Sequence, residues 1–194
     1  MSHMSGLRTG LCLLLCVVAG SVAAAPFGIA QLMQMMAENK PGNATFSEKK
    51  YLAVLDKPVE SSGELRFIPP NRLEKRTVKP KPEMLVLDGD QIQVERRGKK
   101  HVLQLANYPE ISGMVESIRA TLAGDRAALE RVYRLTLQGG SNAWVLNLVP
   151  LDGRVASIVT RIRMEGVRDE VRRMEILLAD GDRSVMQIRP GVVP

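Results

Sequence analysis

Hydrophobic residues recur at helical spacing in two stretches of the chain. Near the N-terminus, Ile29, Leu32, Met33 and Met36 fall on one face of an expected helix, which Pro41-Gly42 ends. The second stretch follows the break at Tyr108-Pro109 and runs to Gly124, a residue suited to cap a helix. Its apolar positions are Ile111, Met114, Val115, Ile118 and Leu122.

Elsewhere, apolar and polar residues alternate, which is typical of strands that bury one face. Asp88-Gly89-Asp90 separates two such runs and predicts a hairpin, and Asp180-Gly181 predicts another. Asp125 is expected to N-cap a short helical turn over 126–130. The expected strands are 44–55, 60–68, 72–78, 84–87, 91–96, 100–105, 133–137, 144–148, 155–164, 170–178 and 183–188.

The pattern predicts a mainly β (α+β) protein with about ten strands and two main helices. The connections are short, so neighbouring strands are expected to be antiparallel. Because sheets twist, so many strands should curl into a curved, unclosed half-barrel. We expect the helices to cover its apolar concave face.

The stretch Gly63 to Pro80, GELRFIPPNRLEKRTVKP, shows how such a sheet turns a corner. Pro69-Pro70 cannot lie within a central strand, because proline lacks the N–H donor that pairing needs. The two prolines are therefore expected between two successive strands. In the first strand, we expect Leu65 and Phe67 to face the concave side and Glu64 and Arg66 to face water.

The first 25 residues have the order of a secretory signal peptide. Arg8 precedes the apolar run 11–18, and the small-residue segment 20–25 follows, with cleavage expected after Ala24 or Ala25. The apolar run is shorter than the roughly 20 residues that span a bilayer. A lipoprotein signal ending at Cys16 is disfavoured by the bulky Leu15 before it. The interpretation is a signal peptide over 1–25 and one exported domain over 26–194.

Composition narrows the chemistry of the exported domain. Both cysteines, Cys12 and Cys16, lie in the leader, so no disulfide or thiolate site is expected after it. The leader contributes only Arg8 to the formal charge, which falls from +6 to +5 when it is removed. The basic run 95–101 fits a solvated hairpin tip or attraction to acidic headgroups or an acidic partner. Nucleic acid is not expected as a partner, because few aromatic residues are present to stack on bases.

The sequence contains no recognisable catalytic motif, and we expect no enzyme activity and no cofactor. His101 is the only histidine after the leader and lies in a basic strand, where a surface position is the simpler interpretation. The aspartates beside Gly89 and Gly181 lack the longer ligand series of a calcium loop, so turn chemistry explains them and no metal site is expected. Eight methionines follow the leader, against seven aromatic residues, which indicates a soft apolar interior.

An apolar concave surface is therefore the candidate functional site. Its position along each strand is inferred from alternation, and a slip of one residue would invert the face. The candidate lining residues are Leu32, Met36, Leu65, Phe67, Val86, Ile92, Val94, Leu135, Trp144, Leu146, Ile162, Met164 and Ile176.

The order of these elements resembles that of the LolA-type periplasmic lipoprotein carriers. The matching residues are Gly63, Leu65, Phe67 and Pro70 in G-x-L-x-F-x-x-P, then Pro80, then Leu87-Asp88-Gly89 with Ile92, and the late segments TLAGDRAALERVYRL and WVLNLVP. The resemblance implies an unclosed antiparallel barrel with a helical lid over an apolar cavity. Where the better-known carriers have a basic residue before the motif proline, which is thought to help hold the lid shut, this chain has Pro69.

The resemblance implies a periplasmic carrier that shields the acyl chains of lipoproteins or other lipids between the inner and outer membranes. Such a carrier would meet donor and acceptor proteins transiently at the two membranes, and we expect it to be a monomer. The alternative hypothesis is a periplasmic interaction module that binds an envelope protein without lipid. An enzyme of lipid or envelope metabolism is disfavoured, because no nucleophile–base pair is present.

Overall fold

A computed structural model describes residues 27–38 and 41–191. The predicted signal peptide lies outside these residues. The elements in chain order are α1 (Ile29–Ala37), β1 (Gly42–Tyr51), β2 (Val59–Ile68), β3 (Arg72–Lys79), β4 (Glu83–Asp88), β5 (Gln91–Arg96), β6 (Lys99–Gln104), the short 3₁₀ helix η1 (Leu105–Asn107), α2 (Pro109–Ala123), α3 (Arg126–Val132), β7 (Tyr133–Gly140), β8 (Ala143–Pro150), α4 (Gly153–Ala156), β9 (Val159–Val167), β10 (Glu170–Leu178) and β11 (Arg183–Pro190).

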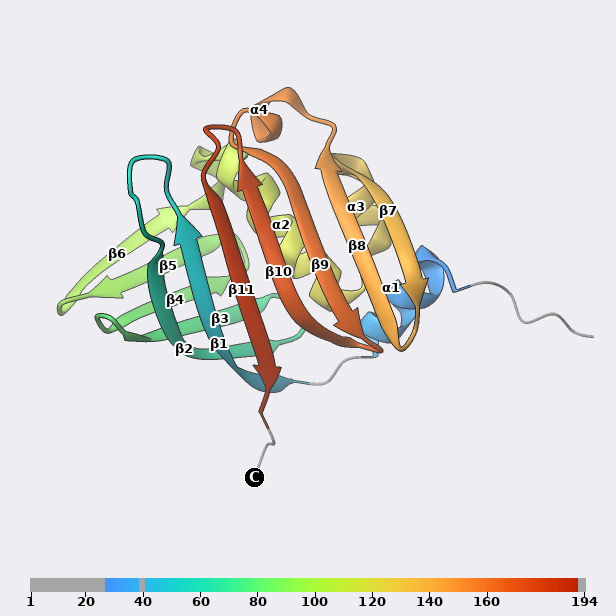
Figure 1. The fold of residues 1–194 in the computed structure, drawn as a ribbon, viewed down its shortest axis with the longest axis horizontal. Coiled ribbons are helices and arrows are strands. Elements are labelled where there is room, and N and C mark those ends of the chain that lie inside the picture. Colours follow the sequence, from blue (N-terminus) through green and yellow to red (C-terminus); the bar gives the residue numbers. More distant parts are fainter. Residues whose placement is uncertain (1–26, 39–40, 192–194) are drawn as a thin grey trace, which may run out of the picture.

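The strands form one antiparallel sheet of eleven in the order β6-β5-β4-β3-β2-β1-β11-β10-β9-β8-β7. The edge strands β6 and β7 are not paired with each other, so the sheet is curved but not closed into a barrel. Figure 1 shows the curvature: β3 to β6 run across the direction of β8 to β11, and the helices lie behind the sheet. The predicted mainly β, half-open antiparallel architecture is confirmed.

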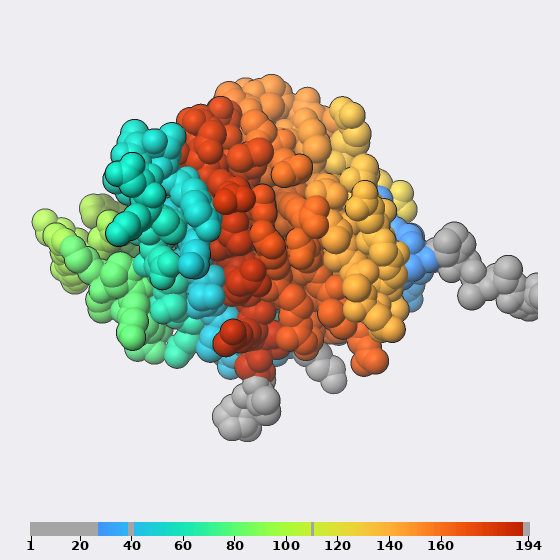
Figure 2. All heavy atoms as spheres, viewed as in Figure 1, coloured from blue at the N-terminus to red at the C-terminus, as the bar shows by residue number. Residues whose placement is uncertain are grey.

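One face of the sheet is covered by helices and the other is not. Figure 2, in the same view, shows the uncovered outer face as a continuous surface of side chains from β1 and β11 to β8. On the inner face, a large core lies where α1, α3 and α4 pack on the sheet, and includes the fully buried Leu32, Trp144 and Leu146. A smaller cluster of Leu87, Ile92 and Leu105 lies on the β4–β5 side.

Turn and capping residues set the limits of these elements. Gly89 has φ +54°, and Leu87 pairs with Ile92 across the predicted hairpin. Gly124 ends α2 in the left-handed conformation, and the Asp125 side chain accepts a hydrogen bond from the Ala128 N–H at 2.9 Å, as predicted. Pro69-Pro70 lies in the predicted corner between β2 and β3.

Two predicted strand limits are wrong. The strand expected over 155–164 begins at Val159, because the Asp152 side chain accepts hydrogen bonds from the Arg154 and Val155 N–H groups and starts α4 instead. The strand expected to end at Leu55 ends at Tyr51, where pairing with β11 stops at Arg183. A turn then brings the Leu55 N–H to the Leu52 carbonyl at 2.9 Å.

Gly63 is required where the sheet bends. The register between β2 and β3 shifts between Ser62 and Gly63, which marks a β-bulge. A Cβ at position 63 would lie 1.9 Å from the Arg76 carbonyl oxygen and 3.0 Å from Cε1 of Phe46. The first glycine of the G-x-L-x-F-x-x-P stretch therefore permits a close backbone approach that no other residue allows.

Within residues 27–38 and 41–191, no helix combines the length and apolar character needed to cross a bilayer.

Candidate functional site: an apolar cavity beneath α2

An apolar cavity of about 350 Å³ lies between α2 and the concave face of the sheet. Seven strands, β1 to β5 with β10 and β11, contribute to its wall, together with Met164 of β9. All but three of the lining side chains are apolar. The lining residues are Glu48, Leu65, Leu73, Lys75, Leu85, Leu87, Ile92, Ile111, Met114, Val115, Ile118, Leu122, Met164, Val171, Met174, Ile176, Ser184, Met186 and Ile188.

Helix α2 forms the roof of this cavity because its apolar residues recur on one face. Pro109 occupies the first turn, where its missing N–H costs nothing. The residues from Ile111 to Leu122 that the helical spacing picks out all line the cavity. On the same helix, Arg119 pairs with Glu116 and donates to the Gly89 carbonyl at 3.4 Å, which ties α2 to the β4–β5 turn.

The cavity wall contains one charged pair. Lys75 Nζ of β3 lies 2.6 Å from Oε2 of Glu48 on β1, and it also lies 4.8 Å from the centre of the Phe46 ring. Ser184 Oγ donates to Glu48 Oε1 at 2.7 Å, and Ser61 Oγ donates to Oε2 at 3.2 Å. Burial acts to raise the pKa of Glu48, but the Lys75 charge and hydrogen bond, the Ser184 hydrogen bond and the Lys50 charge together lower it below its ordinary 4.5. Glu48 is therefore ionised at neutral pH despite its burial.

A second hollow of about 290 Å³ adjoins the cavity. The two spaces share Leu65, Leu73, Leu122, Val171 and Ile188. The hollow reaches past Phe67 to the ends of β1 and β11, at Gly42 and Pro190. Together, the two spaces make a mostly apolar path from the Glu48–Lys75 pair toward that end of the sheet, where Asp169 and Glu170 also line the hollow.

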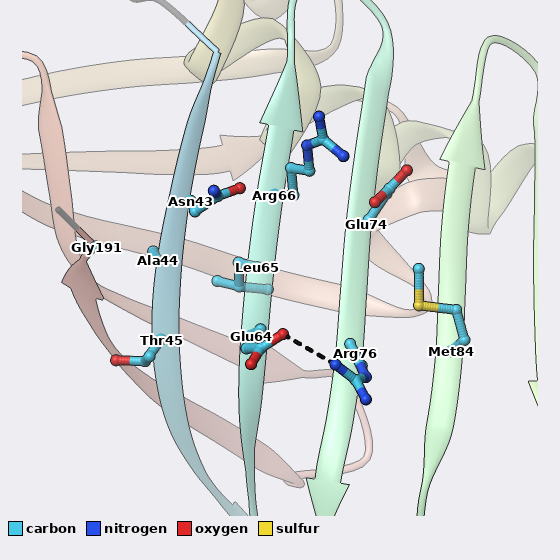
Figure 3. A pocket seen from close by; sticks show the side chains of 10 residues that line it. All are labelled: Asn43, Ala44, Thr45, Glu64, Leu65, Arg66, Glu74, Arg76, Met84 and Gly191. Carbon is cyan, nitrogen blue, oxygen red and sulfur yellow. Dashed lines mark hydrogen bonds and ion pairs between the residues drawn. The ribbon is translucent and has the colours of Figure 1, made fainter. Parts of the chain in front are cut away.

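A larger depression, of about 450 Å³, lies on the outer face over β1 to β4. Figure 3 shows that charged side chains from neighbouring strands lie along it, and that Glu64 and Arg76 form the only interaction drawn there, at 3.4 Å. The other charged groups at this depression are Arg66 and Glu74. Because charged side chains of both signs line it, this surface does not suit an acyl chain.

The structure places the sequence-predicted lining residues in several parts of the fold. Leu65, Ile92, Met164 and Ile176 line the cavity, and Phe67 lines the adjoining hollow. Val94 packs against the small cluster beside the cavity. Six other predicted residues, two on α1 and four on the sheet beneath the helices, belong to the packed core instead of the cavity. These core residues are Leu32, Met36, Leu135, Trp144, Leu146 and Ile162.

Val86 is on the wrong face of its strand for a lining residue. It pairs with Glu74 and Gln93 in the sheet, whereas its neighbours Leu85 and Leu87 line the cavity. The run Met84 to Leu87 is apolar at every position, so alternation could not tell which of its two faces is concave.

Sequence reasoning missed the contribution of α2 and of the Glu48–Lys75 pair. The helical spacing from Ile111 to Leu122 predicted an apolar helix face, and that signal could have placed these residues in the lining. No sequence signal brings Glu48 to Lys75, because their contact depends on the pairing of β1, β2 and β3.

Comparison with known families identifies the family to which this chain belongs. The family described as "Outer membrane lipoprotein carrier protein LolA-like" matches residues 20–188. The chain therefore belongs to this LolA-like family, and the predicted resemblance is confirmed. A comparison with curated proteins found no match.

Several solved structures are similar to this chain at low sequence identity. A LolA superfamily protein from Nitrosomonas europaea is 10% identical over 84% of this chain and 93% of its own, with a TM-score of 0.45. A putative outer membrane lipoprotein-sorting protein domain from Vibrio parahaemolyticus is 11% identical over 86% and 92%, with a TM-score of 0.46. The MucA/MucB complex of Pseudomonas aeruginosa matches at 17% identity over 86% of this chain and 58% of that one, with a TM-score of 0.44.

Proposed function

We propose that this protein is a periplasmic carrier that shields acyl chains of lipoproteins or other lipids in the cavity beneath α2. The observation that carries the proposal is the apolar cavity between α2 and the concave sheet, which the adjoining hollow extends. Membership of the LolA-like family supports it. Each methylene removed from water contributes roughly 0.8 kcal/mol, so a cavity of this kind can hold a chain without covalent chemistry.

The carrier would work without catalysis, by exchange of its cargo with proteins at the inner and outer membranes. In the part of the chain that the structure describes, no group of three or more histidine, cysteine, aspartate or glutamate residues could hold a metal ion. Helix α2 rests on the cavity through side-chain packing, and Arg119 connects it to the β4–β5 turn by a hydrogen bond of 3.4 Å to the Gly89 carbonyl. A roof held in this way suits reversible uptake and release.

A matched pair of substitutions on β4 tests the proposal. Leu85 lines the cavity and Val86 faces away from it, although the two residues are adjacent in the chain. Leu85→Trp should fill the cavity and weaken binding of a fluorescent fatty acid at least about tenfold, because the chain and the indole compete for the same space. Val86→Trp should leave binding within about twofold of the wild type, since it adds the same group to the outer face.

Lipid extraction from the protein after periplasmic expression provides an independent measurement. Mass spectrometry should find acyl lipids with the wild type and fewer with Leu85→Trp. Absence of both co-purified lipid and fatty-acid binding in the folded wild type would refute the carrier proposal. A crosslinked envelope protein in that case would favour an interaction module instead.

A further inference from the structure

A polar group interrupts the apolar wall of the cavity at the Glu48–Lys75 pair. Glu48, Lys75 and Ser184 all line the cavity, and the other lining residues are apolar. Exposure rises outward from this point: the side chain of Glu48 is 5% exposed, that of Lys75 is 22% exposed and that of Lys50 is 50% exposed. The pair therefore lies where the apolar space meets water.

In the Glu48–Lys75 pair, the lysine ammonium keeps hydrogen-bond donors available, whereas the carboxylate already accepts several hydrogen bonds. The Glu48 carboxylate accepts from Lys75, Ser184 and Ser61. The Lys75 ammonium has three N–H donors, and the hydrogen bond that it makes to the described residues is the one to Glu48. Lys50 Nζ lies 3.8 Å from Glu48 Oε1, so two cations surround one anion. A negatively charged acceptor is the ligand group that this local charge favours.

The sheet provides room for the Lys75 side chain to reach Glu48 across β2. Residues 61–63 of β2 are Ser-Ser-Gly, and Ser61 pairs with Glu48 while Gly63 pairs with Phe46. The ammonium then lies between the carboxylate and the Phe46 ring. A buried ion pair is seldom worth more to stability than an apolar pair of the same volume, so stability alone does not account for it.

We propose that the cavity binds a single-chain amphiphile whose anionic head, a carboxylate or a phosphate, accepts a hydrogen bond from Lys75. Its chain runs along α2 toward the hollow beside Phe67 and Pro190. This inference rests on the proposed carrier function and specifies the cargo class. The two adjoining spaces have volumes of about 350 and 290 Å³, which suits one chain rather than several.

Competition binding with three probes of equal chain length tests the proposal: a saturated fatty acid, a lysophosphatidic acid and the uncharged fatty alcohol. The wild type should bind at least one of the anionic probes about tenfold more tightly than the alcohol. The preferred anion distinguishes a carboxylate head from a phosphate head. Lys75→Met keeps the length of the side chain. It should bring the ratio of the affinities for the anionic probe and the alcohol close to one, with the affinity for the alcohol unchanged.

Two further variants separate charge recognition from damage to the fold. Lys75→Arg should keep most of the preference for the anion. Lys79→Met removes an exposed lysine from the same strand and should change nothing, which makes it the matched control. Equal affinity of the wild type for alcohol and anions, or equal weakening of all probes by Lys75→Met, would overturn the inference while leaving an acyl-chain carrier intact. Failure of the wild type to bind any probe would overturn the carrier function as well.

Discussion

Gly113 of α2 lies against Val155 of α4 so closely that a Cβ on Gly113 would be 2.5 Å from one Val155 methyl carbon and 3.3 Å from the other. The Gly113 carbonyl also accepts a hydrogen bond from the Tyr133 hydroxyl at 3.2 Å. Val155 is buried and β-branched, so its side chain has little freedom to move aside. This contact sets how close the roof of the cavity can come to the rest of the fold.

Gly113→Ala tests that contact. Alanine at a helix interior normally stabilises a protein by about 1 kcal/mol relative to glycine, but overpacking in a core costs about 1–3 kcal/mol. We expect a net loss of about 1 kcal/mol in the free energy of unfolding, measured by urea denaturation. Because α2 must shift, a bound fluorescent fatty acid should also dissociate faster.

The double variant Gly113→Ala/Val155→Ala is the control for this prediction. Removal of the two Val155 methyl groups makes room for the new Cβ, so the second substitution should cost less in the Gly113→Ala background than in the wild type. Stabilisation of the protein by Gly113→Ala alone would show that α2 is not held by this contact.

Gly63→Ala should destabilise the sheet more strongly. The added Cβ would meet a backbone oxygen, that of Arg76, at 1.9 Å, and a backbone atom cannot rotate away as a side chain can. We expect a loss of about 2–3 kcal/mol or more in the free energy of unfolding, or failure to fold. Gly140→Ala is the matched control, since a Cβ there has no neighbour within 4 Å. The free energy of unfolding of this variant should stay within about 0.5 kcal/mol of the wild-type value.

The division between core and cavity makes a separate prediction for Leu146. Its side chain is fully buried in the core under α1, α3 and α4 and does not line the cavity. Leu146→Ala should lower the free energy of unfolding by about 2–5 kcal/mol, through lost burial and the void that remains. Its folded fraction should bind a fluorescent fatty acid with unchanged affinity. Weakened binding after correction for the unfolded fraction would place Leu146 in the cargo site.

Much of the fold could be predicted from the sequence because its signals are local. Alternation identifies the strands, and the Asp-Gly turns fix the register of β4 with β5 through the pairing of Leu87 with Ile92. The predicted start of β9 is wrong because a capping residue begins a helix within an alternating stretch. Val155 continues an alternating pattern, yet the Asp152 side chain places it in α4.

The cavity could be predicted only in part, because its extent depends on where the helices lie. Leu65 and Leu146 both face the concave side, but one borders space beneath α2 and the other is covered by the core. Alternation assigns a face and says nothing of what packs on it. At Leu85 and Val86 it fails even to assign the face, since both residues are apolar.

The Glu48–Lys75 pair gives a specific pH dependence. The pKa of Glu48 is lower in the folded protein than its ordinary 4.5, so the unfolded chain binds the proton more readily. The pair therefore makes its full contribution to the free energy of unfolding above a pH of about 4.5. This contribution is lost as the pH falls from there through the lower pKa of the folded state. Glu48→Gln should lower the free energy of unfolding by about 1–2 kcal/mol at neutral pH, less than for a fully buried pair, because Lys75 is partly exposed.

Urea denaturation of the wild type and Glu48→Gln between a pH of about 7 and about 3 measures this dependence. The difference between the two proteins should shrink as the solution is acidified, because protonated Glu48 and glutamine are alike in charge. Asp152→Asn is the control: hydrogen bonds from the Arg154 side chain and backbone lower the pKa of Asp152 from 3.8 to about 2, so its effect should persist to lower pH. A difference between wild type and Glu48→Gln that stays constant across the range would mean that the carboxylate is not held ionised by Lys75.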